Sequence, residues 1–486
     1  MLKNAKFQSS PETLAKGMNT NKSVFSVIHG IGQAMAMVIV IVSAMSCGEQ
    51  SSESNSQETP LVSNPVIGEV AENSDNPNHT YSYYLPTSYN TNQVWPVIYC
   101  FDSHGRGSLP VTKYKDLAER NGYILIGSNK SKNGMAWEET FSHIKIMTEQ
   151  VDSQLIINHK RIYAMGFSGG ARVAVSMAIH KKGVAGVIGC AAGFPKIKQK
   201  LEKRFDYLGI VGSYDFNYVE MLQLNQELKD SDFNSHLLIF DGKHEWPGID
   251  VMKDGFSWME LNSIRSGRET YHDSLIKFSY HLETQKTDQM LNDQEHPLKL
   301  YRQYLKVVNF YKGLTNISKV EEQLALLDDN LVMKKILAKH SDILAQESEI
   351  KGKYAKALAE QPAEWWKTEA ERMGKLIASE DDYVNHCSYL RVMSHLSLVS
   401  YLQCDAAIEQ NELESALRFI DIFSYIDPDN ADHAYFRALV FAKKGQMDEA
   451  LNSLNNAMEL GFDDVERLNN EPLFSSIVDQ VISKPL

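Results

Sequence analysis

The sequence predicts a doubly wound, mostly parallel α/β sheet over residues 78–285, followed by an all-helical region. Two observations lead to this fold class. Short runs rich in β-branched and aromatic residues alternate with amphipathic stretches as far as residue 268, and the strand-like runs stop after residue 286. Strands that alternate with helices form βαβ units with right-handed crossovers, which build a mainly parallel sheet.

Seven segments have the composition of strands. Several are near-continuous apolar runs, as expected where helices cover both faces of a strand. The predicted strands are residues 79–86, 95–102, 123–129, 161–167, 186–193, 205–213 and 235–242. The amphipathic stretches between them predict helices over residues 111–121, 135–156, 169–182 and 216–231. A final helix of this domain is expected around Trp258.

The N-terminal residues have the pattern of an export signal. Scattered lysines precede an apolar stretch that ends "SAMSC", with small residues before Cys47. This ending resembles the lipobox of bacterial lipoproteins, although Ala44 stands where that pattern prefers Leu, Val or Ile. The resemblance implies that residues 1–46 are removed and that Cys47 carries a lipid, which makes the protein an exported, membrane-anchored lipoprotein of the cell envelope. An uncleaved transmembrane anchor is the alternative, because the apolar run is about long enough to span a bilayer.

Residues 47–77 are polar and acidic at first, and we expect them to form a flexible tether between the anchor and the α/β domain. The whole chain has a net charge of −13 and no basic cluster, which argues against nucleic acid as a partner. Its five cysteines form no C-x-x-C pair, so neither a zinc site nor a disulfide framework is expected.

The C-terminal half contains one internal repeat. Residues 412–430 are followed 34 positions later by a similar segment, residues 446–464. The repeat aligns Ala416 with Ala450, Ile420 with Leu454 and Phe423 with Ala457. Residues 397–486 resemble tetratricopeptide repeats, which implies a protein or peptide partner in a concave groove. A plain helical bundle with a chance period is the alternative. Residues 286–396 are assigned only as helices that would extend or cap this stack.

One pentapeptide indicates a candidate catalytic nucleophile. Ser168 is the middle residue of the G-x-S-x-G pattern Gly166–Gly170, which is weak in isolation because chance produces it often. Here a predicted strand delivers the chain to Ser168 and a predicted helix follows it. This strand–turn–helix context is the one that a nucleophile elbow requires. The flanking glycines remove the Cβ atoms that would collide in the tight turn, and the helix N-terminus offers free N–H groups to an oxyanion.

An acid and a histidine follow at later strand ends. A serine hydroxyl needs a histidine to take its proton, and that histidine needs a carboxylate to fix its tautomer. Asp215 comes just after the strand predicted at residues 205–213, and His244 just after the one at residues 235–242. Asp241 is assigned to the turn before His244, and Asp206 lies at the wrong end of its strand.

Over residues 78–268 the chain therefore resembles the α/β-hydrolase superfamily, in its branch of small esterases that includes dienelactone-hydrolase-like and polyhydroxybutyrate-depolymerase-like enzymes. The resemblance implies that Ser168 is the nucleophile, His244 the general base and Asp215 the orienting carboxylate. It also implies an oxyanion hole made by the N–H of Gly169 and an N–H of the loop 101–107, with Arg106 where the second donor usually sits. The residues expected to line the substrate pocket are Asn129, Ser131, Asn133, Phe167 and Trp246.

The sequence thus predicts an exported serine hydrolase that acts on a small-molecule ester through an acyl-enzyme and needs neither cofactor nor metal. A peptidase of the prolyl-oligopeptidase type has the same order of triad residues and is the first alternative. The second is an inactive hydrolase fold whose helical region binds a partner. The sequence does not identify the substrate.

Overall fold

A computed structural model of the chain describes residues 65–196, 205–231 and 233–482. The predicted export signal, Cys47 and most of the predicted tether lie outside these ranges. The described residues belong to one compact unit. Within the described ranges, no helix has both the length and the apolar character needed to cross a membrane.

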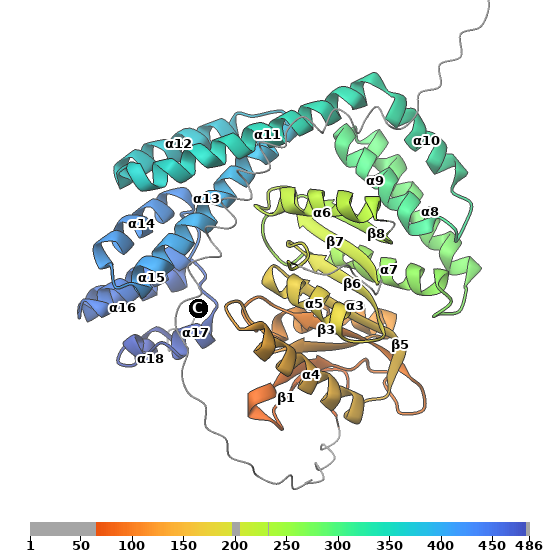
Figure 1. Cartoon of the computed structure of the whole chain (residues 1–486), viewed down its shortest axis with the longest axis horizontal. Helices are drawn as coiled ribbons and strands as arrows, with labels where there is room; N and C mark the ends of the chain where they lie inside the picture. Colours follow the sequence, from red (N-terminus) through yellow and green to blue (C-terminus); the bar gives the residue numbers. More distant parts are fainter. Residues whose placement is uncertain (1–64, 197–204, 232, 483–486) are drawn as a thin grey trace, which may run out of the picture. The chain divides into compact units, whose positions relative to one another are not determined.

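Eight strands form one sheet in the order β1-β2-β4-β3-β5-β6-β7-β8. From β4 to β8 all neighbours are parallel, whereas β1 and β2 are antiparallel additions at one edge. The strands are β1 Val70–Asn73, β2 Tyr81–Tyr84, β3 Trp95–Phe101, β4 Ile124–Ser128, β5 Ile157–Phe167, β6 Val184–Cys190, β7 Asp206–Gly212 and β8 Ser235–Phe240. This mixed, mostly parallel sheet confirms the predicted fold class (Figure 1).

Helices cover both faces of the sheet, which explains why its strands are apolar almost throughout. Along β3, the side chains of Val97, Tyr99 and Phe101 enter one core, and those of Ile98 and Cys100 enter the other. One face packs against α4 Trp137–Gln154, α5 Gly169–His180 and α6 Tyr218–Asp230, and the other against α3 Ser108–Asn121, α7 Ile249–Arg265 and α9 Pro297–Tyr311. Successive residues of a strand point to opposite faces, so a doubly covered strand needs apolar residues at nearly every position.

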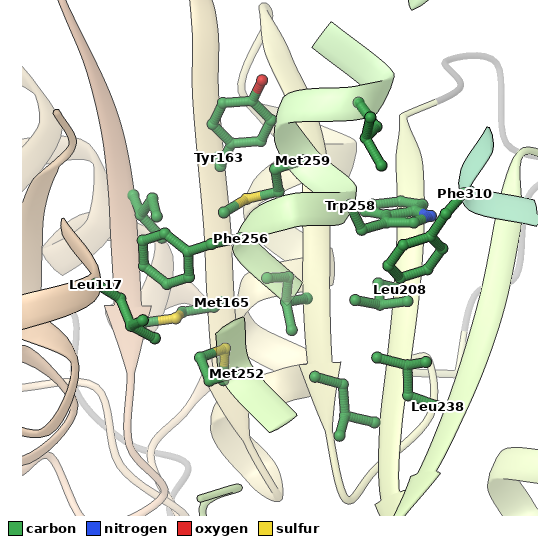
Figure 2. Close-up of a cluster of buried hydrophobic side chains, with 14 of the residues drawn as sticks. Leu117, Tyr163, Met165, Leu208, Leu238, Met252, Phe256, Trp258, Met259 and Phe310 are labelled. Atoms are coloured by element: carbon green, nitrogen blue, oxygen red, sulfur yellow. The ribbon is translucent and has the colours of Figure 1, made fainter. Parts of the chain in front are cut away.

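Figure 2 shows the second of these cores. Phe256 and Met259 of α7 point toward β5, and Met165 of β5 lies between Phe256 and Met252 in this view. Trp258 is turned toward α9, and its indole N–H donates to Oδ1 of Asn309 at 3.1 Å. The helix α9 therefore shares the core of the sheet, although the sequence analysis counted it with the helical region.

After α9 the described residues contain helices and no strand. These helices are α10 Ser318–Asp329, α11 Leu331–Glu360, α12 Ala363–Ala378, α13 Tyr383–Glu409, α14 Leu413–Ile426, α15 Asp432–Lys443, α16 Met447–Glu459, α17 Val465–Asn469 and α18 Val478–Ile482. Between α9 and α7 lies α8 Asp273–Asn292, so the boundary predicted at residue 285 falls inside a helix. Two short 3-10 helices, η1 Pro77–His79 and η2 Pro472–Phe474, complete the described elements.

The predicted repeat has a structural counterpart. The helices α14 and α16 begin at Leu413 and Met447, which preserves the sequence offset, and α13 and α15 pack against them. All six residues that the repeat aligns are buried in one cluster: Ala416, Ile420, Phe423, Ala450, Leu454 and Ala457. The repeated pattern therefore corresponds to the buried face of two helices.

One prediction about the tether is wrong. Residues 70–73, which the sequence analysis included in a flexible tether, form β1 and pair antiparallel with β2, with Val70 opposite Tyr84 and Asn73 opposite Tyr81. An edge strand has one hydrogen-bonding neighbour, and three of these four side chains are partly or fully exposed. The segment "VAEN" therefore lacks the apolar run that marks the inner strands.

Candidate active site

Ser168 lies on a strained turn between β5 and α5. Its backbone angles are φ 53° and ψ −121°, a conformation that non-glycine residues rarely adopt. The turn is held by two backbone bonds: the N–H of Ser168 donates to the carbonyl of Cys190 at 2.9 Å, and that of Ala171 donates to the carbonyl of Ser168 at 3.0 Å. Such strain, of order 1–3 kcal/mol, persists only where the surrounding structure enforces it.

The glycines around Ser168 are required by close backbone approaches. A Cβ atom at Gly166 would overlap the carbonyl of Gly170, and one at Gly170 would overlap the carbonyl of Phe101 at the end of β3. At Gly169 a Cβ would instead meet the side-chain amide of Asn133. The elbow is thus packed directly against the end of β3, with Asn133 lying over the start of α5.

The acid loop joins β7 to α6 and carries Asp215, whose side chain is fully buried. The N–H of Asn217 donates to Oδ1 of Asp215 at 2.7 Å, and the N–H of Tyr218 donates to its carbonyl at 3.0 Å. The side chain of Asn217 in turn donates to the carbonyl of Ala191 at 2.8 Å. These bonds fix the carboxylate at the carboxyl end of the sheet, the edge at which Ser168 also lies.

The histidine loop joins β8 to α7 and carries His244. Nδ1 of His244 lies 3.0 Å from both carboxylate oxygens of Asp215, and Nε2 lies 3.0 Å from Oγ of Ser168. With the Nδ1 proton directed at the carboxylate, a neutral imidazole leaves Nε2 as the acceptor for the serine hydroxyl. The structure therefore brings the three predicted catalytic side chains into one hydrogen-bonded chain.

Aromatic rings and a backbone contact position this imidazole. The ring centroids of Phe216 and Phe167 lie 4.0 and 4.7 Å from that of His244. The two loops also touch each other closely, because a Cβ atom at Gly212 would overlap the carbonyl of Gly242. Phe167 is 8% exposed, so this side chain supports the histidine from within the core.

The loop after β3 is organised by a buried carboxylate that the sequence analysis missed. Asp102 is fully buried, and its Oδ1 accepts from the N–H of His104 at 2.9 Å and from Nε of Arg106 at 3.1 Å. Its Oδ2 accepts from the indole of Trp246 at 2.8 Å. Burial alone would raise the pKa of Asp102, but the bonds from His104, the charge of Arg106 and the bond from Trp246 outweigh it and lower that pKa well below its usual range.

The loop after β3 offers a second candidate, besides Arg106, for the second donor of the predicted oxyanion hole. A Cβ at Gly170 would lie 3.2 Å from the carbonyl carbon of Asp102, so the peptide between Asp102 and Ser103 lies against the elbow. The side chain of Arg106 instead contacts Asp102 and, at 3.8 Å, Asp463. No hydrogen bond recorded for the described residues uses the N–H of Ser103 or that of Arg106, so both remain candidates for the second donor. The approach of the Asp102–Ser103 peptide to Gly170 favours Ser103.

The other predicted pocket residues lie in different surroundings. Asn133 is exposed beside Gly169, and its N–H donates to the carbonyl of Ser103 at 2.8 Å. Asn129 accepts from Ser82 at 3.0 Å and therefore braces the sheet. Ser131 and Trp246 are buried, at 1% and 5% exposure. Of the five predicted lining residues, Asn133 is the one that combines exposure with a position at the elbow.

The cysteines near the site are not alternative nucleophiles. Cys100 and Cys190 are fully buried, and burial raises the pKa of both thiols far above the usual value. A thiol becomes nucleophilic only as the thiolate, so these two side chains remain inert. Among the described residues, no group of His, Cys, Asp and Glu side chains is arranged to hold a metal ion.

No family model matches the chain, and no curated protein matches it in sequence. Solved structures do match it. S-formylglutathione hydrolase from Staphylococcus aureus is 14% identical, with a TM-score of 0.34 over 39% of this chain and 98% of that one.

Two further solved structures resemble part of the chain. A feruloyl esterase module from Clostridium thermocellum is 12% identical, with a TM-score of 0.29 over 38% of this chain and 81% of that one. Acylaminoacyl peptidase from Pyrococcus horikoshii is 14% identical, with a TM-score of 0.29 over 37% of this chain and 39% of that one.

Sequence reasoning overlooked Asp102, and one signal points to it in retrospect. An aspartate directly after a buried, fully apolar strand needs partners, because an unpaired buried carboxylate is strongly unfavourable. Its partner Trp246 lies 144 residues away in the chain, so the pairing exists only in the folded α/β domain.

Proposed function

We propose that this protein is a serine hydrolase that cleaves a carboxylic ester of a small molecule through an acyl-enzyme on Ser168. The observation that carries the proposal is the hydrogen-bonded chain from Ser168 Oγ through His244 to the buried Asp215, with 3.0 Å at each step. A serine, an imidazole and a carboxylate in this order are the groups that nucleophilic acyl transfer requires.

In the proposed reaction, the Ser168 hydroxyl attacks the ester carbonyl carbon while Nε2 of His244 takes its proton. Asp215 keeps the imidazole in the correct tautomer and stabilises the imidazolium that forms. The N–H groups of Gly169 and Ser103 hold the oxyanion. The imidazolium then protonates the departing alcohol. Water, activated by the same histidine, hydrolyses the acyl-enzyme and restores the serine.

A fluorophosphonate probe tests the proposal, because it phosphonylates a serine only when a base activates it. Full-length wild type is expected to label at Ser168, and Ser168→Ala is expected not to label. The matched control is Ser176→Ala, a buried serine on the same helix whose hydroxyl donates to the carbonyl of Arg172. Absence of labelling in the folded wild type, or equal labelling of Ser168→Ala, would refute the proposal.

Substrate assays separate the esterase from the peptidase alternative. All strands of the described residues belong to one sheet, so nothing there supports the large β-propeller expected of a prolyl-oligopeptidase-type enzyme. We expect p-nitrophenyl esters to be hydrolysed and peptide anilides to be left intact. An acyl-length and aryl-ester series would then define the substrate, and activity on anilides alone would favour the peptidase.

Export and lipidation through Cys47 remain part of the proposal. They rest on the N-terminal sequence pattern, which falls outside the described residues. Cys47→Ser is expected to release the protein from the membrane fraction of an expressing bacterium. Unchanged partitioning of this variant would contradict lipidation and favour the uncleaved transmembrane anchor.

A role for the C-terminal helices in binding a protein or peptide partner is proposed as well. It is supported by the equal spacing of the helix starts at Leu413 and Met447 and by the common burial of the aligned residues. In tetratricopeptide-like stacks, burial of this kind joins neighbouring repeats, and the stacked helices form a concave surface that binds the partner. Crosslinking of the full chain in its host tests this, since a stack that only completes the fold would yield no specific adduct.

A further inference from the structure

Side chains of the helical region reach both loops that carry the triad. Arg391 on α13 is 1% exposed, and its Nη1 donates to the carbonyl of Ser213 at 2.8 Å. Ser213 is the first residue after β7 and precedes Asp215 by two positions. Tyr383, at the start of the same helix, donates its hydroxyl to Oδ1 of Asp241 at 2.8 Å. Asp241 follows β8 and precedes His244 by three positions.

The two loops are also bonded to each other at these same residues. The hydroxyl of Ser213 donates to Oδ1 of Asp241 at 3.1 Å, and the N–H of Ser213 donates to the carbonyl of Phe240 at 2.7 Å. Lys299 on α9 adds an ion pair of 2.5 Å to Oδ2 of Asp241. Ser213 and Asp241 thus connect the two loops, and α13 binds both of these residues, Ser213 through Arg391 and Asp241 through Tyr383.

The guanidinium of Arg391 is itself held in place. Its Nε and Nη2 lie 2.8 Å from Oε2 of Glu347 on α11, which is also 1% exposed. Glu347 is further bound by Ser388 at 3.1 Å and by Lys351 at 2.8 Å. The Nε–H of Arg391 donates to this single carboxylate oxygen, with Nη2 beside it, and Nη1 is left to donate to the acid loop.

Arg391 contacts the other end of the acid loop too. Its guanidinium carbon lies 4.6 Å from the ring centroid of Tyr218, the first residue of α6. The hydroxyl of Tyr218 receives a bond of 2.6 Å from Arg302 and lies 3.0 Å from Nε2 of His340. Asp215 therefore sits in a segment, residues 213–218, that helical-region side chains hold on both sides.

Stability alone is a poor reason for such a buried pair. Removing two charges from water is expensive, and replacing a buried ion pair by apolar residues is often neutral or stabilising. A buried pair does fix one arrangement of the elements that it joins. Here those elements are α11, α13 and the loop that carries Asp215.

We propose that Arg391 and Tyr383 are positioning residues of the catalytic triad, so that the helical region is a working part of the active site. Arg391 sets the acid loop through Ser213, and Tyr383 sets the histidine loop through Asp241. The inference rests on the proposed serine-hydrolase function.

The test compares full-length Arg391→Met, Arg391→Lys and Tyr383→Phe by ester kinetics after normalising to folded protein by circular dichroism. For Arg391→Met we expect kcat to fall by about ten- to a hundredfold, because small misplacements of catalytic groups have effects of this order, while KM stays within about twofold. For Tyr383→Phe we expect a smaller fall in kcat, since the ion pair with Lys299 still holds Asp241 in place. Arg391→Lys keeps a donor for the Ser213 carbonyl and is expected to recover part of the loss.

The rate of fluorophosphonate labelling separates positioning from folding. When Asp215 and His244 are displaced, the step in which Ser168 reacts slows in the folded protein, so labelling of Arg391→Met is expected to slow together with kcat while KM is kept. The control is Arg437→Met, which removes an arginine–aspartate pair of the same 2.8 Å length between α14 and α15. This control is expected to keep the wild-type kcat and the wild-type labelling rate.

The possible failures are distinguishable. If wild type labels with fluorophosphonate and Arg391→Met retains the wild-type kcat and labelling rate, the positioning role is overturned and the hydrolase proposal stands. If Arg391→Met and Arg437→Met lose activity equally, the effect is on folding and the positioning role is again overturned. If folded wild type neither labels nor hydrolyses esters, the proposed function and this inference both fall.

Discussion

The indole N–H of Trp246 donates to the buried carboxylate of Asp102 at 2.8 Å, across 144 residues of chain. This bond joins the histidine loop to the loop after β3, which is the loop proposed to supply an oxyanion donor. Two further bonds hold the histidine loop, because Lys113 and Tyr114 of α3 donate to the carbonyls of Trp246 and Pro247 at 3.0 and 2.7 Å. The loop that carries His244 is therefore positioned by elements from separate parts of the sequence.

Removing this bond is expected to weaken both loops. Trp246→Phe leaves Oδ2 of Asp102 without its donor, and an unsatisfied buried acceptor costs about 1–3 kcal/mol in free energy of unfolding. Urea denaturation measures this loss, and ester kcat should fall with it. In a double-mutant cycle with Asp102→Asn, we expect a coupling above about 0.5 kcal/mol. Additive effects would show that the bond contributes nothing of its own.

The two glycines after Ser168 are expected to respond differently to alanine. Gly170→Ala forces a Cβ into the backbone of Phe101, which has no room to move, so we expect about 1–3 kcal/mol of destabilisation and loss of fluorophosphonate labelling. Gly169→Ala meets only the side-chain end of Asn133. The double variant Gly169→Ala/Asn133→Ala should therefore regain the thermal stability of Asn133→Ala. Equal melting losses for the two glycine variants would contradict this view of the elbow.

The aromatic contact of Phe216 with His244 is expected to matter most when the imidazole is charged. The face of an aromatic ring attracts a cation, so Phe216 is expected to stabilise the imidazolium that would form in the proposed acyl transfer. Phe216→Leu should lower kcat by about two- to tenfold with little change in KM. Phe194→Leu is the control, since that ring packs 4.8 Å from Tyr207 and makes no recorded contact with His244. A raised KM with unchanged kcat in Phe216→Leu would assign the ring to substrate binding instead.

His236 on β8 makes the fold sensitive to mild acid. Burial, with a smaller effect from Lys229 and Lys306, lowers the pKa of this histidine from 6.5 to about 3. Below pH 6.5 the unfolded chain binds a proton at His236 that the folded protein does not bind until near pH 3, so stability falls as the pH falls through this window. The slope is at most about 1.4 kcal/mol per pH unit.

Thermal melts of wild type and His236→Gln at pH 7 and pH 5 test this. The variant is expected to lose less stability than wild type between the two values, because glutamine takes up no proton. Because the ring of His236 packs 5.9 Å from that of Phe310, some loss for His236→Gln is expected at both pH values. The decisive quantity is the stability that each protein loses between pH 7 and pH 5. If wild type and His236→Gln lose the same amount between these two pH values, His236 does not titrate in this window.

Local patterns in the sequence predicted most of the sheet and the triad. A buried parallel strand needs apolar residues on both faces, and a nucleophile elbow needs glycines around its serine. Both requirements can therefore be recognised in a short stretch of sequence. The order of Ser168, Asp215 and His244 could be read because each follows a strand, and the carboxyl ends of parallel strands meet at one edge. The edge strand β1 could not be recognised in this way, because the partly exposed residues of an edge strand need not form an apolar run.

Tertiary structure alone decided how these residues are held. The partners of Asp102 and of the acid loop, Trp246 and Arg391, lie 144 and 178 residues away from the groups they bind. Nothing in the local sequence marks an arginine on a distant helix as the donor for Ser213, because pairing across such a separation depends on how whole elements pack. The sequence by itself therefore determined the fold class and the three catalytic candidates. The packing of the helical region against the acid and histidine loops decided what keeps those candidates in place.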